Sequence, residues 1–468
     1  MIFHSLVYLI FLPVVLAIYW SLSRQWQNVF LIGASYVFYG WEHPWFLLPL
    51  WASTLVDYGC ARAMDQWPQQ RRLFLLISVC GSLALLGTFK YANFVLDNVD
   101  ALLTELGSRP LQVVLRLALP VGISFYTFQS IGYVVDVYRR RIPAERNLIK
   151  YALYVTFFPQ LVAGPIERAG HMLPQYSKPR QFNAELWRGA LGLMLWGFFK
   201  KVVVADNVAI VANKIFALSS PSFPVLWAGA LAFTVQIYAD FSAYTDIARG
   251  TARLLGFELM QNFMHPYIAT SPSDFWRRWH ISLSTWMRDY VYIPLGGSRC
   301  GVLRNSFNLF ATFLISGLWH GASWNFVLWG AYWGTLLLIE RAWTAVRPMS
   351  RLPWLAKVAG TFALACIGWL FFRERDFGQL IHDLTLSPLA ATKRDWAIGF
   401  YFVQLICLYS LPLAIHLLFT GIFPNWNPEL RLPERRRFVF ETAVGIVLFM
   451  GILTLRSLTT SDFIYFQF

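Results

Sequence analysis

The sequence predicts an all-α polytopic membrane protein. Of its 468 residues, 57% are hydrophobic and only 14% are charged, whereas charged residues make up about 25% of a typical soluble domain. Apolar runs long enough to cross a hydrocarbon core recur along the chain and predict roughly ten or eleven transmembrane helices. Several runs are interrupted by proline or charge. We therefore also expect interfacial and re-entrant helices, which are stable only where protein or a cavity surrounds them.

The positive charge of the chain indicates cytoplasmic loops and not a nucleic-acid-binding surface. The formal net charge is +14, but the basic residues are scattered between apolar runs, as the positive-inside rule describes for cytoplasmic loops. The sequence therefore predicts no nucleic-acid partner. We also expect no metal site, because metal-ligand spacing is lacking among the five cysteines, which are Cys60, Cys80, Cys300, Cys366 and Cys407.

The first predicted crossings lie at residues 3–20, 28–40, 45–56, 73–89 and 113–138. The second and third runs are short and are joined by a polar turn, which predicts a hairpin. No basic residue precedes the first run and Arg24 follows it, so we expect a retained span with a periplasmic N-terminus and not a cleaved signal. Asp97, Asp100 and Glu105 mark an outer loop, and the three arginines at residues 139–141 mark an inner one.

The middle of the chain holds apolar runs that carry charged or helix-breaking residues. Lys200 and Lys201 lie within the run 188–216, and Pro159 interrupts the run 151–166. We expect the two lysines to pair with acids or to extend towards the membrane surface. Uninterrupted spans are predicted again near the C-terminus, at residues 358–372, 400–419 and 440–455.

A stretch rich in tryptophan and arginine is predicted to form one amphipathic helix. Ser271 can cap its N-terminus, Pro272 suits the first helical position, and Asp274 follows in the first turn. Helical periodicity sorts the later side chains into an apolar face with Trp276, His280, Leu283 and Met287 and a polar face with Arg277, Ser284 and Arg288. Such a helix can lie at the membrane interface, with the histidine directed into the protein.

A second histidine, His320, ends an apolar run that begins at Arg304. On a helix this run carries His320 roughly 23 Å along the axis, a depth at which an ionisable side chain is costly and usually functional. Gly317 and Gly321 flank the histidine and are expected to leave room for a substrate. A buried, neutral imidazole is a competent general base. For His280, a structural role with the ring bonded to a backbone carbonyl stays open.

Motifs along nearly the whole chain resemble the membrane-bound O-acyltransferase superfamily, and within it the bacterial alginate O-acetyltransferase membrane subunits and related exopolysaccharide acetylation proteins. The resemblance rests on DFWRRWHISLSTWMRDYVYIPLGGSR, LWHGASWNFVLWGAYWG, LPVGISFYTFQSIGYVVDVYR, GFFKKVVVADN and FIYFQF. It implies a helical fold around a tunnel across the membrane, built as a single domain of residues 1–468 with its catalytic region at about residues 240–330. It also implies that His320 occupies the essential histidine position and His280 the second one.

The function implied by the resemblance is acyl transfer in the bacterial inner membrane. The protein would take an acetyl group from a cytosolic thioester, acetyl-CoA, for O-acetylation of an alginate- or cellulose-type exopolysaccharide. The implied partners are membrane lipid, a periplasmic acetyltransferase-like protein and a polysaccharide synthesis complex, and no cofactor is expected. His320 would act as a general base or form an acetyl-imidazole. The candidate substrate-binding residues are Arg277, Arg278, Arg288 and Trp319, with the arginines receiving the donor's phosphates.

Two alternative functions stay open on the sequence. D-alanyl transfer to teichoic acid would use the same histidines, so the residues around them do not exclude it. A non-enzymatic polysaccharide or lipid transporter is the other alternative, and both the paired histidine motifs and the lack of an internal sequence repeat disfavour it. Hydrolase and nucleotide-driven functions have no support, because the sequence contains no HExxH, P-loop or GxSxG motif.

Overall fold

A computed structural model describes the chain except for residues 116, 163, 347–351, 375, 425–431, 460–462 and 465–468. Every regular element in the described residues is a helix, which confirms the predicted all-α class. Five helices are long and apolar enough to cross a membrane, and α1 (Leu6–Ser21) is a shorter apolar helix. The five candidate spans are Pro68–Glu105, Phe223–Leu254, Trp354–Arg373, Lys393–Ile422 and Glu434–Leu455.

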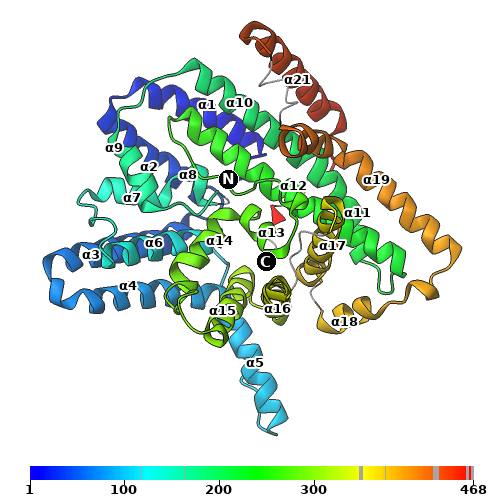
Figure 1. Ribbon diagram of the computed structural model, residues 1–468. Helices are drawn as coiled ribbons and strands as arrows, with labels where there is room; N and C mark the ends of the chain where they lie inside the picture. Colours follow the sequence, from blue (N-terminus) through cyan, green and yellow to red (C-terminus); the bar gives the residue numbers. More distant parts are fainter. Residues whose placement is uncertain are drawn as a thin grey trace. The chain divides into compact units, whose positions relative to one another are not determined.

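The chain divides into two compact units, of which the first contains residues 1–187, 251–260 and 321–323. Its further helices are α2 (Arg24–Gly40), η1 (Pro44–Phe46), α3 (Leu47–Gln66), η2 (Pro68–Gln70), α4 (Arg71–Leu86), η3 (Gly87–Tyr91), α5 (Ala92–Glu105), α6 (Ile123–Tyr138), α7 (Leu148–Thr156), α8 (Phe158–Leu161) and α9 (Ala169–Ser177). Helices α3, α4 and α6 lie side by side (Figure 1). The carboxylate of buried Asp57 joins two of them, because it accepts hydrogen bonds from Ser53 of α3 and Ser78 of α4.

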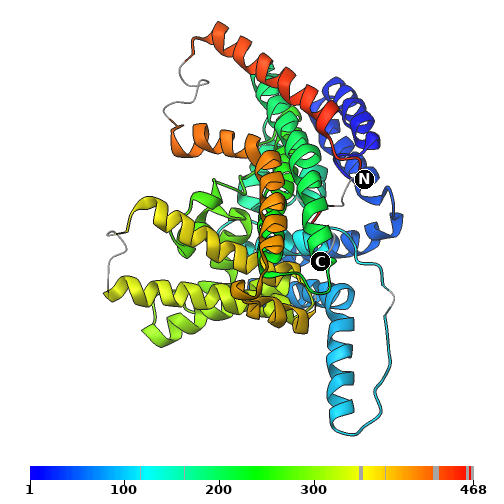
Figure 2. The same ribbon diagram turned by 90° about the vertical axis from the view of Figure 1, so that its right-hand side faces the viewer.

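The acidic stretch after the fourth predicted crossing is helical and not a loop, which corrects the prediction. Asp97, Asp100 and Glu105 lie on α5, which continues α4 through the π-helical turn η3. Figure 2 shows α5 extending away from α3, α4 and α6, with the chain returning beyond its tip. The Asp100 carboxylate accepts hydrogen bonds from the backbone N–H groups of Leu111 (2.6 Å) and Gln112 (3.0 Å). These bonds tie the returning chain to the helix.

The predicted crossing at residues 113–138 is helical only from Ile123 onward. Proline restricts the residue before it to extended backbone, and Pro120 stands three residues before the start of α6. Gly122 caps the helix in the left-handed region with φ 78°. A Cβ atom there would lie 2.4 Å from the Leu161 carbonyl oxygen. Only glycine therefore allows this entry into α6.

The second unit contains residues 188–250, 261–320 and 324–468. Its helices are α10 (Ala184–Phe199), η4 (Lys200–Ala205), α11 (Asp206–Phe216), α12 (Phe223–Leu254), η5 (Pro266–Ile268), α13 (Pro272–Arg278), α14 (Ile281–Met287), η6 (Arg288–Tyr292), α15 (Val302–His320), α16 (Trp324–Val346), α17 (Trp354–Arg373), α18 (Phe377–Thr385), η8 (Pro388–Ala390), α19 (Lys393–Leu417), η9 (Leu418–Ile422) and α21 (Glu434–Leu455). Helices α10 and α12 each have one end in the first unit: residues 184–187 of α10 and residues 251–254 of α12.

The two lysines of the run 188–216 pair with acids, as predicted. Lys201 is completely buried and contacts the carboxylates of Asp206 and Asp240 at 3.0 and 2.9 Å. Lys200 contacts the carboxylate of Asp246 at 2.6 Å. Both lysines stand on the π-helical segment η4 between α10 and α11. An apolar helix tolerates such charges when they are paired inside protein.

Candidate active site

The helix before His280 begins as the sequence predicts. Ser271 caps α13, because its hydroxyl accepts the N–H of Asp274 at 3.2 Å, and Pro272 occupies the first turn. The carboxylate of Asp274 accepts the N–H of Thr270 at 3.0 Å. Glu340 of α16 adds a second anchor by accepting the N–H and the hydroxyl of Ser273 at 2.8 and 2.7 Å. These hydrogen bonds thus fix the start of α13 to α16, which belongs to the same unit.

The stretch from Pro272 to Arg288 was predicted to be one amphipathic helix. It does not form one helix, which corrects the prediction. Helix α13 ends at Arg278 and α14 begins at Ile281, and His280 between them has left-handed backbone angles (φ 43°, ψ 54°). The cause is a neighbouring segment that binds the backbone at the break. The Ile281 N–H donates to the Asn262 carbonyl, and the Met264 N–H donates to the Arg278 carbonyl, both at 2.9 Å. Asn262 is fully buried, and no local sequence signal indicates its role.

The break places the His280 imidazole among aromatic rings. Its ring centroid lies 4.8 Å from that of Phe241 on α12 and 6.0 Å from that of Trp319 on α15. The residue has no exposed surface. Burial lowers the pKa of His280 to about 3, because the charged imidazolium loses its solvation. The side chain is therefore neutral at cellular pH, a state that can accept a proton or a hydrogen bond.

The second histidine, His320, is the last residue of α15 and is 4% exposed. Its ring lies 4.9 Å from Trp319, 4.9 Å from Trp329 of α16 and 5.2 Å from Phe372 of α17, measured between ring centroids. Three helices thus build an aromatic surround for one imidazole. Such a surround excludes water and strengthens electrostatic interactions with a reacting group.

Trp319 connects the two histidines that the sequence identified separately. Its indole contacts the His320 ring at 4.9 Å and the His280 ring at 6.0 Å, and both contacts are edge-on. All three residues are buried and belong to the second unit. The structure therefore brings His280, His320 and Trp319 into one site. Sequence reasoning did not single out Phe241 and Phe372, which complete its walls, although Phe241 lies within the motif DFSAYTDIARG.

The predicted arginine face does not form, because the break at His280 ends the helical periodicity that would align it. Arg278 pairs with Asp274 at 2.9 Å, and Arg288 pairs with Asp289 at 2.8 Å. Arg277 is exposed and donates to the Ser273 hydroxyl at 3.3 Å. These arginines stand on both sides of the break and not on one polar stripe.

The C-terminal residues support the wall beside His280. The Phe463 ring lies 4.0 Å from Tyr244 and 5.8 Å from Phe241, the aromatic neighbour of His280. The next residue, Ile464, donates its N–H to the Asp240 carboxylate at 2.8 Å. Both C-terminal side chains are buried. Residues 463 and 464 are therefore packed against α12 where this helix meets the site.

Gly317 serves helix packing, which corrects the expectation that it leaves room for substrate. A Cβ atom at Gly317 would lie 2.1 Å from the Phe326 carbonyl oxygen, and one at Gly330 would lie 2.4 Å from the Phe313 carbonyl oxygen. The backbones of α15 and α16 thus touch at this glycine pair. The contact sets the position of α15 and of His320 at its end.

We expect Gly317→Ala to destabilise the protein, because the added methyl group forces the α15 and α16 backbones apart. Overpacking of this kind costs about 1–3 kcal/mol. The measurement is the thermal unfolding midpoint in detergent. Gly192→Ala on α10 is the matched control, since nothing lies within 4 Å of a Cβ atom there and alanine favours a helix. Equal midpoints for Gly317→Ala and the wild type would contradict the packing role.

The described residues contain no group of three or more His, Cys, Asp or Glu side chains that could hold a metal ion. The chemistry available at the site is that of two buried imidazoles surrounded by aromatic rings. This arrangement suits proton transfer or nucleophilic attack on an acyl group.

Comparison with known proteins identifies the relatives of the chain. Residues 36–374 match the membrane-bound O-acyltransferase family. The chain is 40% identical to a probable alginate O-acetylase of Pseudomonas putida, with 100% of both chains covered. It is 31% identical to a peptidoglycan O-acetyltransferase of Helicobacter pylori, with 98% of this chain and 95% of the relative covered. A teichoic acid D-alanyltransferase of Bacillus subtilis is 24% identical over 55% of this chain and 69% of its own length.

Proposed function

The chain belongs to the membrane-bound O-acyltransferase family and is an acyltransferase, and we propose that it moves an acetyl group across the bacterial inner membrane for O-acetylation of an exopolysaccharide. The observation that carries the proposal is the pair of buried histidines joined by Trp319 in a chain that matches acetyl-transferring relatives over its whole length. The donor is a cytosolic thioester, acetyl-CoA, and the acceptor is an alginate- or cellulose-type polymer.

The proposed reaction needs one base and an environment that excludes water. The imidazole of His320 takes the proton of the acceptor hydroxyl as the oxygen attacks the acetyl carbonyl carbon. A C–O bond forms, the C–S bond of the thioester breaks, and the thiolate receives the proton from the imidazolium. In the covalent variant of this route, the imidazole nitrogen attacks the acetyl carbonyl carbon first, a C–N bond forms as the C–S bond breaks, and the thiolate leaves with the imidazole proton. The acceptor oxygen then attacks the acetyl-imidazole, a C–O bond forms as the C–N bond breaks, and the hydroxyl proton returns to the imidazole. Both routes require the same buried histidine.

A periplasmic acetyltransferase-like protein and a polysaccharide synthesis complex complete the proposed pathway. Arg277, Arg278 and Arg288 are proposed to receive the phosphates of the donor, because guanidinium groups bind phosphate with paired hydrogen bonds. For Arg278 and Arg288, donor binding would have to compete with the ion pairs to Asp274 and Asp289. Residues 1–468 are proposed to form a single membrane-embedded acyltransferase domain, with the catalytic region at about residues 240–330.

The test of the proposed function is complementation of a strain that lacks the chain's gene. Mild base releases ester-linked groups from the exported polymer, and NMR identifies them. We expect acetate in the complemented strain and none in the deletion strain, with polymer secretion unchanged. Release of D-alanine from a cell-wall polymer would favour D-alanyl transfer, which the more distant D-alanyltransferase match keeps as the second candidate. The membership of an enzyme family argues against the non-enzymatic transporter.

The membrane orientation is a separate prediction. We expect the N-terminus and the acidic end of α5 (residues 97–105) to face the periplasm, and the arginines at residues 139–141 to face the cytoplasm. The reason is the alternation of acidic and basic segments under the positive-inside rule. Reporter fusions placed after Glu105 and after Arg141 measure the two sides. Fusions that report the same side would contradict the assignment.

His280 can be tested for chemistry and for backbone strain separately. His280→Ala is expected to lower both activity and stability, because it removes a fully buried ring and leaves a cavity among its aromatic neighbours. Asparagine tolerates the left-handed backbone at this position, so His280→Asn is expected to keep the fold but to impair acetylation. Acetyl transfer and the unfolding midpoint are measured on one preparation. Normal acetylation by His280→Asn would show that His280 serves only the backbone.

A further inference from the structure

A buried carboxylate in the first unit has hydroxyl groups as its hydrogen-bond partners. Asp57 on α3 is fully buried. Its carboxylate accepts hydrogen bonds from Ser78 at 2.5 Å, from Ser53 at 3.1 Å and from Ser82 at 3.4 Å. Two of these serines, Ser78 and Ser82, belong to the candidate span Pro68–Glu105. A carboxylate packed against a membrane span is a candidate functional group.

The negative charge of Asp57 has no counterpart in the part of the chain that the structure describes. No lysine, arginine or histidine among these residues forms an ion pair with the Asp57 carboxylate. Serine hydroxyls stabilise a carboxylate by hydrogen bonds, but they leave its charge in place. A buried charge is costly unless it is paired, binds a metal ion or is neutralised by protonation. The choice at Asp57 is therefore between a proton and a bound cation.

Two further hydroxyl groups beside Asp57 bear on this choice. Ser130 of α6 lies next to the carboxylate, and Tyr151 of α7 lies next to Ser130. Both side chains are fully buried. Among the described residues, neither hydroxyl oxygen has a partner with the geometry of a hydrogen bond. Buried polar groups in native proteins nearly always have a partner, which can be protein, water or an ion.

One bound cation accounts for both the charge and the two hydroxyl groups. A proton on Asp57 would neutralise the charge but would give Ser130 and Tyr151 no partner. A water molecule would give them a partner but would leave the charge in place. A cation neutralises the carboxylate and is coordinated by the hydroxyl oxygens at the same time. These oxygens keep lone pairs for a cation even while their hydrogens are donated to the carboxylate.

The oxygen atoms around Asp57 define the class of cation. Carboxylate and hydroxyl oxygens are hard ligands, which suit cations such as Na⁺ or Ca²⁺ and not metals that prefer sulfur or nitrogen. The set carries one negative charge, so a monovalent ion leaves the buried site neutral and a divalent ion does not. The Ser82 hydroxyl lies 3.4 Å from each carboxylate oxygen. Neighbouring oxygens have this spacing in an octahedral shell with metal–oxygen distances of about 2.4 Å.

We propose that a sodium ion binds between α3, α4, α6 and α7. Its ligands are the side-chain oxygens of Asp57, Ser53, Ser78, Ser82, Ser130 and Tyr151. All of these residues belong to the first unit, whereas His280 and His320 belong to the second. The proposal therefore does not depend on acetyl transfer. By taking ligands from four helices, the ion stabilises their packing.

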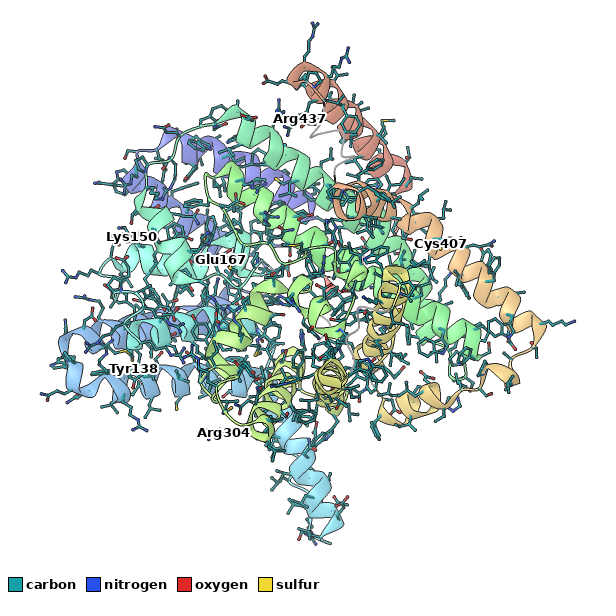
Figure 3. All side chains as sticks on the ribbon, viewed as in Figure 1. Tyr138, Lys150, Glu167, Arg304, Cys407 and Arg437 are labelled. Atoms are coloured by element: carbon teal, nitrogen blue, oxygen red, sulfur yellow. The ribbon has the colours of Figure 1, made fainter. Side chains whose placement is uncertain are left out.

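The helices around the proposed ion are also joined by contacts outside the site. Tyr138, labelled in Figure 3, is the last residue of α6. Its carbonyl accepts a hydrogen bond at 3.2 Å from the guanidinium of Arg71, the first residue of α4. The Tyr154 hydroxyl of α7 donates to the Gln129 carbonyl of α6 at 3.2 Å. Variants that lose one ligand of the ion are therefore expected to fold.

The test measures the thermal unfolding midpoint of the purified full chain in detergent, as NaCl replaces choline chloride at constant pH and ionic strength. We expect Na⁺ to raise the midpoints of the wild type and of Asp65→Asn equally. Asp65 is the matched control, because it is an exposed aspartate on the same helix, α3. Asp57→Asn should abolish the Na⁺ response, because the amide keeps the shape of the side chain but not its charge.

Tyr151→Phe and Ser130→Ala separate ion binding from packing. Each removes an oxygen that has no partner of good geometry among the described residues, so the midpoint in choline chloride should change little. The apparent Na⁺ affinity should nevertheless fall roughly tenfold, as loss of one contact to a charged group predicts. Binding of radiolabelled Na⁺ to the same preparations gives a second readout. Unchanged Na⁺ affinity in both variants would overturn the assignment of these ligands.

An equal Na⁺ response of the wild type and Asp57→Asn would overturn the proposal, and so would a wild type that does not respond to Na⁺. If the wild type then loses stability as the pH rises and Asp57→Asn does not, Asp57 is protonated and water serves the two hydroxyls. A larger response to Ca²⁺ than to Na⁺ at equal ionic strength would overturn the assignment of a monovalent ion.

Discussion

His320→Gln is expected to abolish detectable acetylation of the exported polymer. Glutamine keeps a hydrogen-bonding side chain of similar bulk, but it cannot take up a proton in the physiological range. Loss of a general base typically lowers the rate by 10²–10⁴-fold, and loss of an essential nucleophile can cost more. The imidazole lies inside an aromatic surround of Trp319, Trp329 and Phe372. We therefore expect no water molecule beside residue 320 to replace the imidazole as a base.

The measurement for His320 is the ester-linked acetate of the polymer, compared at equal protein level in the membrane. His382→Gln is the matched control, because His382 is an exposed histidine on α18 of the same unit. Protein level, membrane localisation and polymer secretion should stay near the wild-type values in both variants. Near-normal acetylation by a well-expressed His320→Gln protein would show that the proposed role of His320 is wrong.

Lys201→Met is expected to cause the largest loss of stability. The Lys201 ammonium is completely buried and contacts Asp206 at 3.0 Å and Asp240 at 2.9 Å. Methionine has a similar length but no charge, so two carboxylates would stay buried without their cation. Breaking a buried ion pair by removing one partner typically costs 3–5 kcal/mol. The Asp240 carboxylate also accepts the Ile464 N–H, so the packing of residues 463 and 464 against α12 should weaken as well.

Membrane yield and the thermal unfolding midpoint measure this effect. Lys214→Met is the matched control, because Lys214 is an exposed lysine on α11, in the same unit. The triple variant Lys201→Met, Asp206→Asn and Asp240→Asn should recover part of the stability, since it removes the unpaired charges. Wild-type stability of the single Lys201→Met variant would mean that the buried ion network contributes little to the fold.

Local patterns in the sequence determined the fold class and the identity of the candidate catalytic residues. Apolar runs of membrane-spanning length made the all-α class evident, because in lipid the backbone must satisfy its hydrogen bonds within each segment. The start of α13 followed from Ser271 and Pro272, since capping depends on residues within one helical turn. His280 and His320 were recognisable because ionisable side chains are rare in such apolar surroundings.

Only the tertiary structure decided how these residues are presented. Periodicity predicted one helix through His280, but the backbone groups of Asn262 and Met264 bind the chain at the break and interrupt it. The sequence also predicted that Gly317 leaves room for a substrate beside His320. In the structure, the α16 backbone occupies that room. Both outcomes depend on hydrogen bonds and contacts between segments that are distant in sequence. The period of a single helix contains no information about such partners, so the geometry around His280 and His320 could not be predicted from local pattern.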